Sequence, residues 1–436
     1  MKKIEFLRSH HPQFFYNSYS YELRGKDLHI AFEFTAPPKV KFRPTLVIHG
    51  LTKGDIKRVG KQALDNLVFN LGIIEMFSYW KSTASPEIVV RAGSLNRGQI
   101  SWWKNLLIKG MGQYFYENRI DFTDPNFVRI RSQGKDGLSP YKKALTGKTL
   151  VPLGGGKDGS VTWELLKGAD YDITAFALNP TQTHKQIFRV GKIVKPITIT
   201  RTIDPALLSL NKKGYLNGHT PFSAYLAFLT VITAVLFDYK YIALSNERSS
   251  NEGNVRYLGK SVNHQYSKTY EFEKNFREYS KEYLATNVEY FSFLRPLYEL
   301  QIAKLFANYP QYYYVFLSCN EAHKTDSGTK KGEGKWCCNC SKCLFVYLAL
   351  SPFLDEQELK SIFGQNLLKS KNLAPVLDEL IGKKKFKPFE CVGTIEESKA
   401  ALTRKGLEKI LGSWNTEHFL PKDLTTILKD AIIKES

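Results

Sequence analysis

Three consecutive glycines mark the segment of the chain whose residue types most clearly suggest chemistry, Gly154-Gly-Gly-Lys-Asp-Gly-Ser160. They follow a short apolar run at 149–153 and precede a segment of helical periodicity. Glycine lets a ligand approach the backbone closely, and loop amides at the start of a helix bind anions. We therefore predict a phosphate site made of Gly154, Gly155, Gly156, Lys157, Asp158, Gly159 and Ser160.

This loop differs from two common nucleotide motifs. The P-loop requires Ser or Thr after Gly-Lys, where this chain has Asp158. The dinucleotide fingerprint is met in form by Gly154, Gly156 and Gly159, but Asn179 stands where the next strand should end in an acidic residue. A strand–turn–helix junction that merely needs glycine is the structural alternative.

Four cysteines lie within seven residues, in Trp336-Cys-Cys-Asn-Cys-Ser-Lys-Cys343, and another lies upstream beyond a polar loop. Two successive C-x-x-C spacings place sulfurs where they can share one metal. Four thiolates from two short segments are typical of structural zinc. The predicted zinc ligands are Cys319, Cys337, Cys340 and Cys343.

Alternatives to zinc stay open at this point. An iron–sulfur cluster or metal-free thiols would use the same cysteines, and His323 is a possible substitute ligand. Cys338 is then an extra thiol, and we interpret Cys391 as a packed one.

Further polar runs could supply metal, phosphate or acid–base groups. Asn246, Glu247 and Arg248 follow a predicted buried strand and could meet Mg²⁺, phosphate or a carboxylate. A solvated ion pair of Glu247 and Arg248 is the alternative. The acid–base candidates by residue type are His219, Glu247, His264 and Lys268. Capping of the long apolar helix is the alternative role for His219.

The elements that must position these residues alternate between strands and helices. We predict strands at 149–153, 172–178, 197–200 and 241–244, separated by helices that reach 166, span 182–189, start near 205 and span 224–237. Such alternation produces right-handed βαβ units and a parallel sheet, so the fold class is α/β. Ligands bind beyond the carboxyl ends of such strands.

The N-terminal region has a different pattern. Strands at 28–34 and 45–48 and helices at 61–80 and 99–118 predict an α+β domain, followed by a linker at 133–140. Short amphipathic helices are expected from 355 onward. The predicted domains are 1–147, 148–310 with the glycine loop, and 311–436 with the cysteines and a helical C-terminus.

Charge and hydropathy narrow the class of protein. The 436 residues carry a formal charge of +20, and residues 1–150 hold 24 basic and 12 acidic side chains, which predicts an anionic partner. The longest apolar stretch, 224–237, is shorter than the ~20 residues that span a bilayer. The first twelve residues are polar. We therefore expect a cytoplasmic protein without a secretory signal, a disulfide framework or membrane insertion.

The glycine loop resembles the pyrophosphate-binding loop of the ATP pyrophosphatase (PP-loop) superfamily, Ser-Gly-Gly-x-Asp-Ser-Ser/Thr. Gly155, Gly156, Asp158 and Ser160 match it, whereas Gly154 and Gly159 stand at positions that are often Ser. An ordered set of runs is similar to one family in particular, the ATP-dependent UDP-N-acetylmuramoyl-L-alanyl-L-glutamate epimerases of peptidoglycan synthesis. The runs lie at 154–158, 217–221, 245–249, 262–268, 294–300, 318–320, 336–343, 362–368 and 387–393.

This resemblance implies an isomerase with a PP-loop core of the adenine-nucleotide hydrolase type. The family turns the terminal L-Glu of UDP-MurNAc-L-Ala-L-Glu into D-Glu, while ATP becomes AMP and pyrophosphate. Activation as an acyl-adenylate removes the carboxylate charge that opposes loss of the Cα proton. The expected cofactors are ATP, Mg²⁺ and structural Zn²⁺, and the resemblance does not assign the acid and the base.

Two other classes compete with this interpretation. A tRNA-modifying ATP pyrophosphatase would use the same loop, and the basic N-terminal region fits it, but RNA binding would bring a steep salt dependence. A non-catalytic nucleotide-binding or zinc-scaffold protein would bind ATP without releasing pyrophosphate. The phosphates of a UDP-sugar substrate also fit the basic region, so this region does not separate the epimerase from the tRNA enzyme. The expected partner is the substrate UDP-MurNAc-L-Ala-L-Glu and not a nucleic acid.

Overall fold

The structure, a computed structural model, describes residues 3–135, 137–323 and 334–433. The strands are β1 (Gln13–Arg24), β2 (Asp27–Ala36), β3 (Val40–Phe42), β4 (Thr45–His49), β5 (Glu87–Val90), β6 (Arg129–Ser132), β7 (Thr149–Pro152), β8 (Ile173–Leu178), β9 (Ile197–Thr202), β10 (Tyr241–Leu244), β11 (Val255–Tyr257), β12 (Lys260–Val262) and β13 (Glu289–Ser292).

The α-helices lie between and after these strands. They are α1 (Lys3–His10), α2 (Lys53–Val59), α3 (Lys61–Trp80), α4 (Arg97–Gly110), α5 (Gly112–Glu117), α6 (Lys157–Gly168), α7 (Gln182–Val190), α8 (Pro205–Lys212), α9 (Phe222–Phe237), α10 (Tyr270–Tyr279), α11 (Glu299–Phe306), α12 (Ser341–Leu350), α13 (Glu356–Phe363), α14 (Ala374–Leu380), α15 (Ile395–Thr403), α16 (Leu407–Leu411) and α17 (Lys422–Ile433).

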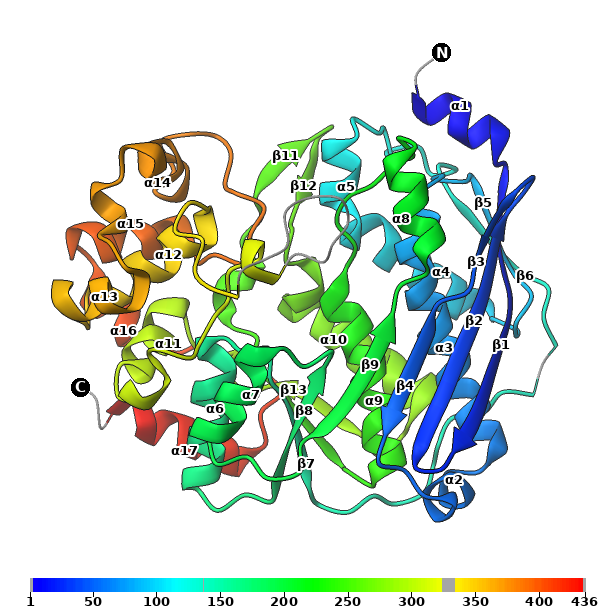
Figure 1. Cartoon of the computed structure of the whole chain (residues 1–436), viewed down its shortest axis with the longest axis horizontal. Helices are drawn as coiled ribbons and strands as arrows, with labels where there is room; N and C mark the ends of the chain where they lie inside the picture. Colours follow the sequence, from blue (N-terminus) through cyan, green and yellow to red (C-terminus); the bar gives the residue numbers. More distant parts are fainter. Residues whose placement is uncertain (1–2, 136, 324–333, 434–436) are drawn as a thin grey trace.

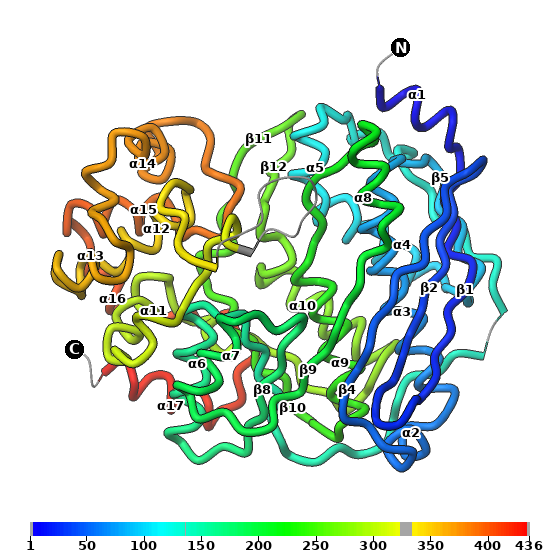
Figure 2. Tube along the Cα trace, in the orientation of Figure 1, coloured from blue at the N-terminus to red at the C-terminus, as the bar shows by residue number. Residues whose placement is uncertain are grey.

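One large sheet organises the molecule. Eleven of the described strands pair in the order β13-β10-β7-β8-β9-β4-β2-β1-β5-β6, with β3 paired to β2, and β11 and β12 form a separate hairpin. Figure 1 shows β1 to β4 on one side of the molecule and helices α12 to α16 on the other. The trace in Figure 2 places the N-terminal end beside the first group and the C-terminal end below the second. The protein is thus a mixed α/β protein with a mostly parallel central sheet.

The parallel part of the sheet confirms the predicted βαβ alternation. Strands β7, β8, β9 and β10 each begin or end within two residues of the predicted bounds, and neighbouring strands of β9-β8-β7-β10-β13 all pair in parallel. Their short apolar runs are buried by the crossover helices. Helix α9 is apolar nearly all round, as a buried helix requires, and its residues from Ala227 to Leu236 are all buried.

The N-terminal strands extend the same sheet, but the first of them pair antiparallel instead of parallel. Strand β4 pairs antiparallel with β9, and β2 and β1 follow in antiparallel register. The predicted strands at 28–34 and 45–48 and the helix at 61–80 are confirmed as β2, β4 and α3. The long strand β1 was not predicted, although polar residues alternate with Tyr19, Tyr21 and Leu23 along it.

The helix predicted at 99–118 is divided in two. Helix α4 ends at Gly110 and α5 begins at Gly112, with Met111 between them. A Cβ on Gly110 would lie 2.9 Å from the ring of Pro221, so the close approach of the segment before α9 requires glycine here.

The C-terminal helices form a second core around α12. Buried side chains of α6, α11, α12 and the helices beyond residue 355 contact one another, which confirms short helices in that region. A first core joins α3 and α9 with the N-terminal strands. The division into domains at 147/148 and 310/311 stays a prediction. Residue 136 of the predicted linker lies outside the described residues.

A buried ion pair joins the N-terminal region to the parallel strands. Arg201 of β9 donates from Nε and Nη2 to the two carboxylate oxygens of Glu75 on α3, at 2.8 and 2.9 Å. The Glu75 side chain is 1% exposed. The guanidinium also lies 4.5 Å from the ring centre of Tyr225.

No helix in the described ranges combines the length and the apolar character needed to cross a bilayer.

We expect Glu75→Ala to lower the free energy of unfolding by about 3 kcal/mol, because it leaves the buried guanidinium of Arg201 without a counter-ion. Urea denaturation followed by circular dichroism measures the change. Glu22→Ala, which removes an exposed partner of Arg24, is the control and should change stability far less. Equal losses in the two variants would contradict the structural role of the buried pair.

Candidate functional site

The candidate site lies where the strand order reverses. From β7 the chain continues to β8 and β9 on one side, whereas β10 and β13 lie on the other side of β7. In such sheets a ligand-binding crevice opens at the carboxyl ends of the two central strands, here β7 and β10. The glycine loop follows β7 and the polar run at 245–249 follows β10, and the two strands pair in parallel, so both segments meet at this point.

The glycine loop has one position that requires glycine and one that faces open space. Gly155 has φ +84°, and a Cβ there would lie 2.9 Å from Cγ2 of Thr183. Its carbonyl accepts a 2.8 Å hydrogen bond from the amide of Leu317. Among the described residues, nothing lies within 4 Å of where a Cβ on Gly154 would be. A ligand can therefore approach the backbone at Gly154.

Helix α6 begins directly after this loop with uncapped amides. Its N-cap residue is Gly156, which has no side chain to accept hydrogen bonds from the first turn. The Ser160 hydroxyl donates to the carbonyl of Gly156 at 3.2 Å. A Cβ on Gly159 would approach Cδ2 of Leu153 to 3.1 Å, so this position favours glycine. Uncapped helix amides beside open space are suited to an anion.

A charged cluster lies at the same end of α6. The Lys157 ammonium donates to the carboxylates of Asp158 and Glu299. Asp158, Glu247 and Glu299 each place one carboxylate oxygen within 4.8 Å of the others. Lys157 and Glu247 are 2% exposed and Glu299 is 1% exposed, whereas Asp158 is only half-buried. Asp158 therefore forms the accessible side of the cluster.

Burial and charge set the protonation of these groups. Burial would raise the pKa of Asp158, but the charges of Lys157, Lys342 and Lys268 together outweigh burial, and the pKa is lowered. Burial raises the pKa of Glu247 and Glu299, and the charge of Asp158 contributes to both shifts. Oxygen ligands of this kind suit a hard divalent cation, which would stabilise the ionised carboxylates. The three carboxylates could thus hold Mg²⁺.

A second polar group adjoins this cluster through Lys268. The Lys268 ammonium lies 3.4 Å from the sulfur of Cys391, and that sulfur lies 3.9 Å from Nε2 of His264. Cys391 is half-buried, and its polar neighbours differ from those of the packed thiol that we predicted. The structure therefore corrects that interpretation.

The two predicted histidines lie together. The ring centres of His219 and His264 are 4.5 Å apart. Burial lowers the pKa of both, that of His264 to about 3, so both rings are neutral at pH 7. The N-cap of α9 is Pro221, so the alternative in which His219 caps this helix is wrong. Nε2 of His219 is buried and has no hydrogen-bond partner among the described residues.

Two other predicted site residues have structural contacts. The Asn246 amide donates to the Ser292 hydroxyl at 3.1 Å. The Arg248 guanidinium lies 4.3 Å from the ring centre of Tyr298. Arg295, which is fully buried, donates to the carbonyl of Glu247 at 2.6 Å and so holds the loop that carries this carboxylate.

The structure thus brings together the predicted groups Lys157, Asp158, Glu247, His219, His264 and Lys268. Sequence reasoning did not assign a role to Glu299 or Arg295, although both lie in the run at 294–300. A charged side chain within such a mainly apolar segment is a sign that the charge is buried and paired.

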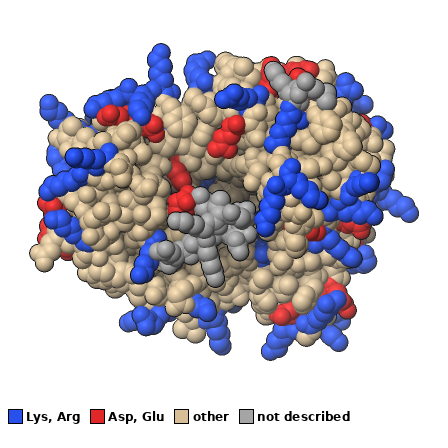
Figure 3. Space-filling model, turned by 45° about the horizontal axis from the view of Figure 1, so that its top comes forward, with Lys and Arg blue, Asp and Glu red and all other residues tan. Residues whose placement is uncertain are grey.

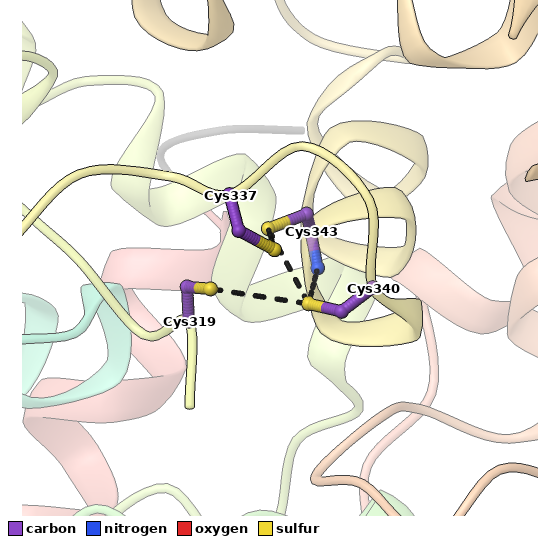
Figure 4. A group of neighbouring side chains, drawn as sticks. All are labelled: Cys319, Cys337, Cys340 and Cys343. Carbon is purple, nitrogen blue, oxygen red and sulfur yellow. Dashed lines mark hydrogen bonds between the residues drawn. The ribbon is translucent and has the colours of Figure 1, made fainter. Parts of the chain in front are cut away.

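Four cysteine side chains, those of Cys319, Cys337, Cys340 and Cys343, point toward one another and form a four-cysteine site (Figure 4). The sulfur atoms of Cys319 and Cys340 are 3.9 Å apart, those of Cys337 and Cys343 are 3.7 Å apart, and those of Cys340 and Cys343 are 3.5 Å apart. Four sulfurs bound tetrahedrally to zinc at 2.3 Å would be about 3.8 Å apart. The predicted ligands therefore have the spacing that a tetrahedral thiolate-bound ion requires.

The extra thiol, Cys338, is turned away from this set. Its sulfur donates to the carbonyl of Phe363 at 3.1 Å. The side chain of His323, the possible substitute ligand, lies outside the described residues.

The four-cysteine site is tied to both parts of the candidate site. Cys319 follows by two residues Leu317, whose amide bonds to Gly155. Lys342 lies between two of the cysteines, and its ammonium donates to the carbonyl of Cys391. These hydrogen bonds connect the segments that carry the four cysteines to the glycine loop and to the backbone of Cys391.

Figure 3 shows a hollow in the middle of one face. Acidic side chains lie on one side of it, and Lys and Arg side chains gather on the other side. Such a basic margin favours anionic ligands.

The fold and the site together define an α/β protein with a glycine-rich loop and a carboxylate cluster at the switch point of its sheet. A family model described as the MurL N-terminal domain matches residues 5–293, and one described as the MurL C-terminal domain matches residues 315–429. The chain belongs to the MurL family.

Curated relatives agree with this assignment. The chain is 35% identical to a UDP-N-acetyl-alpha-D-muramoyl-L-alanyl-L-glutamate epimerase of a Micromonospora species, over 76% of this chain and 73% of the relative. It is 33% identical to proteins of the same name from Salinispora tropica, over 90% and 84%, and from Xanthomonas oryzae, over 76% and 72%.

We expect Cys319→Ser to abolish stoichiometric zinc and to lower the thermal unfolding temperature, because three thiolates complete the site less well than four. Elemental analysis of the purified protein measures the metal. Cys338→Ser is the matched control and should keep its zinc. The assignment would be contradicted if the unsubstituted protein contained no zinc. It would also be contradicted if the Cys319→Ser and Cys338→Ser variants contained equal amounts of zinc.

Neutral His264 should make the protein less stable in mild acid. The unfolded chain binds a proton on this residue below about pH 6.5, whereas the folded chain does so only near pH 3, so stability falls as the pH falls through this window. Between pH 7 and pH 5 this group contributes a loss of about 2 kcal/mol. His264→Gln should lose less stability over this interval in urea titrations.

His10→Gln, at an exposed position on α1, is the control and should behave like the unsubstituted chain. If His264→Gln shows the same loss between pH 7 and pH 5 as the unsubstituted chain, the buried neutral state is wrong.

Proposed function

We propose that this chain is an ATP-dependent epimerase that converts the terminal L-Glu of UDP-MurNAc-L-Ala-L-Glu into D-Glu during peptidoglycan precursor synthesis. The names of its relatives support the substrate and the reaction. The observation that carries the proposal is the uncapped N-terminus of α6 beside open backbone at Gly154, next to the cluster of three carboxylates.

ATP would bind with its outer phosphates at the glycine loop, as in the PP-loop superfamily. The residues for this role are Gly154 to Gly156 and the first turn of α6, whose amides have no side-chain cap. The charge of an outer phosphate would be stabilised by these amides and by the helix dipole. Leu317 fixes the loop from the opposite side through its bond to Gly155.

Mg²⁺ would be held by Asp158, Glu247 and Glu299, because these oxygens lie within 4.8 Å of one another and face the loop from three elements. The cation would neutralise phosphate charge as well as that of the carboxylates. Lys157 forms ion pairs with two of these carboxylates, so its positive charge would offset part of their negative charge when no metal is bound.

Activation of the substrate makes the epimerisation chemically accessible. Loss of the Cα proton beside an ionised carboxylate would place two negative charges on adjacent carbons. Transfer of AMP to the carboxylate removes one charge and releases pyrophosphate, and the carbonyl can then accept the electron pair from the Cα–H bond. Each lowering of the activation free energy for Cα proton loss by about 1.4 kcal/mol raises the rate of that step tenfold.

Proton transfer requires an acid and a base on opposite faces of Cα. His219 and His264 can accept protons, because their lowered pKa values keep both rings neutral. Lys268 stays charged, since nearby Cys391, Glu247 and Asp158 raise its pKa although burial alone would lower it. It can therefore donate a proton or stabilise a developing negative charge.

Zinc at Cys319, Cys337, Cys340 and Cys343 would have a structural role. Four protein ligands fill a tetrahedral zinc ion and leave no position for substrate. Its contribution would be to hold the segment that bonds Gly155 and the lysine that bonds Cys391.

The proposal predicts that AMP and pyrophosphate form only when ATP, Mg²⁺ and UDP-MurNAc-L-Ala-L-Glu are all present, and that D-Glu appears in the product. We expect Asp158→Asn to lower the rate of AMP formation at least 100-fold, since it removes an anionic Mg²⁺ ligand. Chromatography of nucleotides and chiral analysis of the hydrolysed product measure both quantities.

Asp170→Asn, beyond the other end of α6, is the matched control and should leave the rate within twofold of the unsubstituted protein. Replacement of the UDP-dipeptide by bulk tRNA should produce no AMP. AMP formation that depends on tRNA, or ATP binding without any turnover, would reject the epimerase.

A further inference from the structure

Cys391 is a reactive group that the proposed function has not used. Its thiol is half-buried and lies between the Lys268 ammonium, at 3.4 Å, and Nε2 of His264, at 3.9 Å. Cysteines that only pack lie among apolar side chains, whereas reactive ones lie in electropositive, partly accessible surroundings. The surroundings of Cys391 are of the second kind.

The orientation of His264 is fixed by a chain of hydrogen bonds. The Gln113 amide nitrogen donates to Glu117 at 2.7 Å, so its oxygen is turned toward Nδ1 of His264, at 2.6 Å. Nδ1 therefore carries the proton of the neutral ring, and the lone pair of Nε2 is directed at Cys391. This lone pair can accept a hydrogen bond from the S–H group.

Lys268 connects the thiol to the carboxylate cluster. Its buried ammonium contacts the sulfur of Cys391, and the charges of Glu247 and Asp158 act on it. A neighbouring ammonium attracts a thiolate, and the same ammonium adjoins the carboxylates that we assign to Mg²⁺. A substrate carboxylate activated at the glycine loop would thus have its Cα close to this sulfur.

The backbone of Cys391 is also held firmly. Its carbonyl accepts a hydrogen bond from Lys342, and the preceding residue, Glu390, accepts one from Asn320. Both donors belong to segments that carry the cysteine site. A proton-transfer group needs such fixed placement, because small displacements cost rate.

We propose that Cys391 is a catalytic residue of the epimerisation, one of the two groups that move the Cα proton; this inference rests on the proposed function. The thiolate removes the proton, so an S–H bond forms and the Cα–H bond breaks. The electron pair of the Cα–H bond moves into the Cα–carbonyl bond, and the carbonyl oxygen takes the charge. A second acid of the cleft then protonates Cα from the opposite face, and the electron pair returns to form the new C–H bond.

His264 serves in this scheme as a positioning residue. Nε2 accepts a hydrogen bond from the S–H group and so directs the sulfur, while the proton leaves the sulfur for solvent, which restores the thiolate. A neutral imidazole with its lone pair toward the thiol is suited to this role.

The test separates proton exchange from adenylation. We expect Cys391→Ala and Cys391→Ser to lower the incorporation of solvent deuterium at Cα at least 100-fold with the epimer whose Cα proton faces the sulfur; mass spectrometry with each epimer as substrate measures the exchange. Pyrophosphate formation in the same samples should fall less than tenfold. Cys338→Ser, the matched thiol control, should change neither rate more than twofold.

Three results are distinguishable. If the unsubstituted protein forms no pyrophosphate with the UDP-dipeptide, the proposed function itself fails. If pyrophosphate forms and both Cys391 variants exchange deuterium within threefold of the unsubstituted rate, only the role of Cys391 is overturned. A covalent substrate adduct on Cys391, seen in the intact mass, would mean that the sulfur attacks the carboxyl carbon, and would overturn proton transfer as well.

Discussion

The interaction on which the site depends is the buried ammonium of Lys157 between two carboxylates. Lys157 and Asp158 begin helix α6, and Glu299 begins α11, so their contacts join the starts of two helices that lie far apart in the sequence. An ammonium and a carboxylate as deeply buried as Lys157 and Glu299 would be costly alone. Together they compensate each other, and the glycine loop is thereby fixed at the end of β7.

The cysteine site extends this arrangement to segments that the sheet does not order. The segment before Cys319 bonds to the glycine loop through Leu317, and Lys342, between two other cysteines, bonds to the backbone of Cys391. The glycine loop and Cys391 come from positions more than 230 residues apart in the sequence. A single four-cysteine site contacts both, which is how a short segment far from the sheet can influence the site.

Much of the parallel sheet could be predicted because its strands and helices have clear local patterns. Helix α3 begins and ends at the predicted residues, and β10 has the predicted bounds. The glycine loop and the group of four cysteines could be recognised because the spacing of their residues is specific to few kinds of site. Strand β1 was missed although its polar and aromatic residues alternate.

The rest of the site depends on contacts between distant residues that no local pattern contains. Glu299 is a site residue because Lys157, 142 positions earlier, is buried against it. Cys391 appeared to be a packed thiol beside Pro388 and Phe389, and only the fold places it next to His264 and Lys268. Continuity of the sheet from β9 to β4 likewise depends on pairing across about 150 residues.

The central claim is that the substrate carboxylate is joined to AMP at the glycine loop. The most direct measurement uses UDP-MurNAc-L-Ala-L-Glu labelled with ¹⁸O in the α-carboxylate of its terminal glutamate, followed by mass spectrometry of the AMP released. If water hydrolyses an acyl-adenylate at its carbonyl carbon, the bridging oxygen stays with phosphorus, and AMP carries one ¹⁸O. AMP without label, formed at the same rate as the D-epimer, would contradict the account.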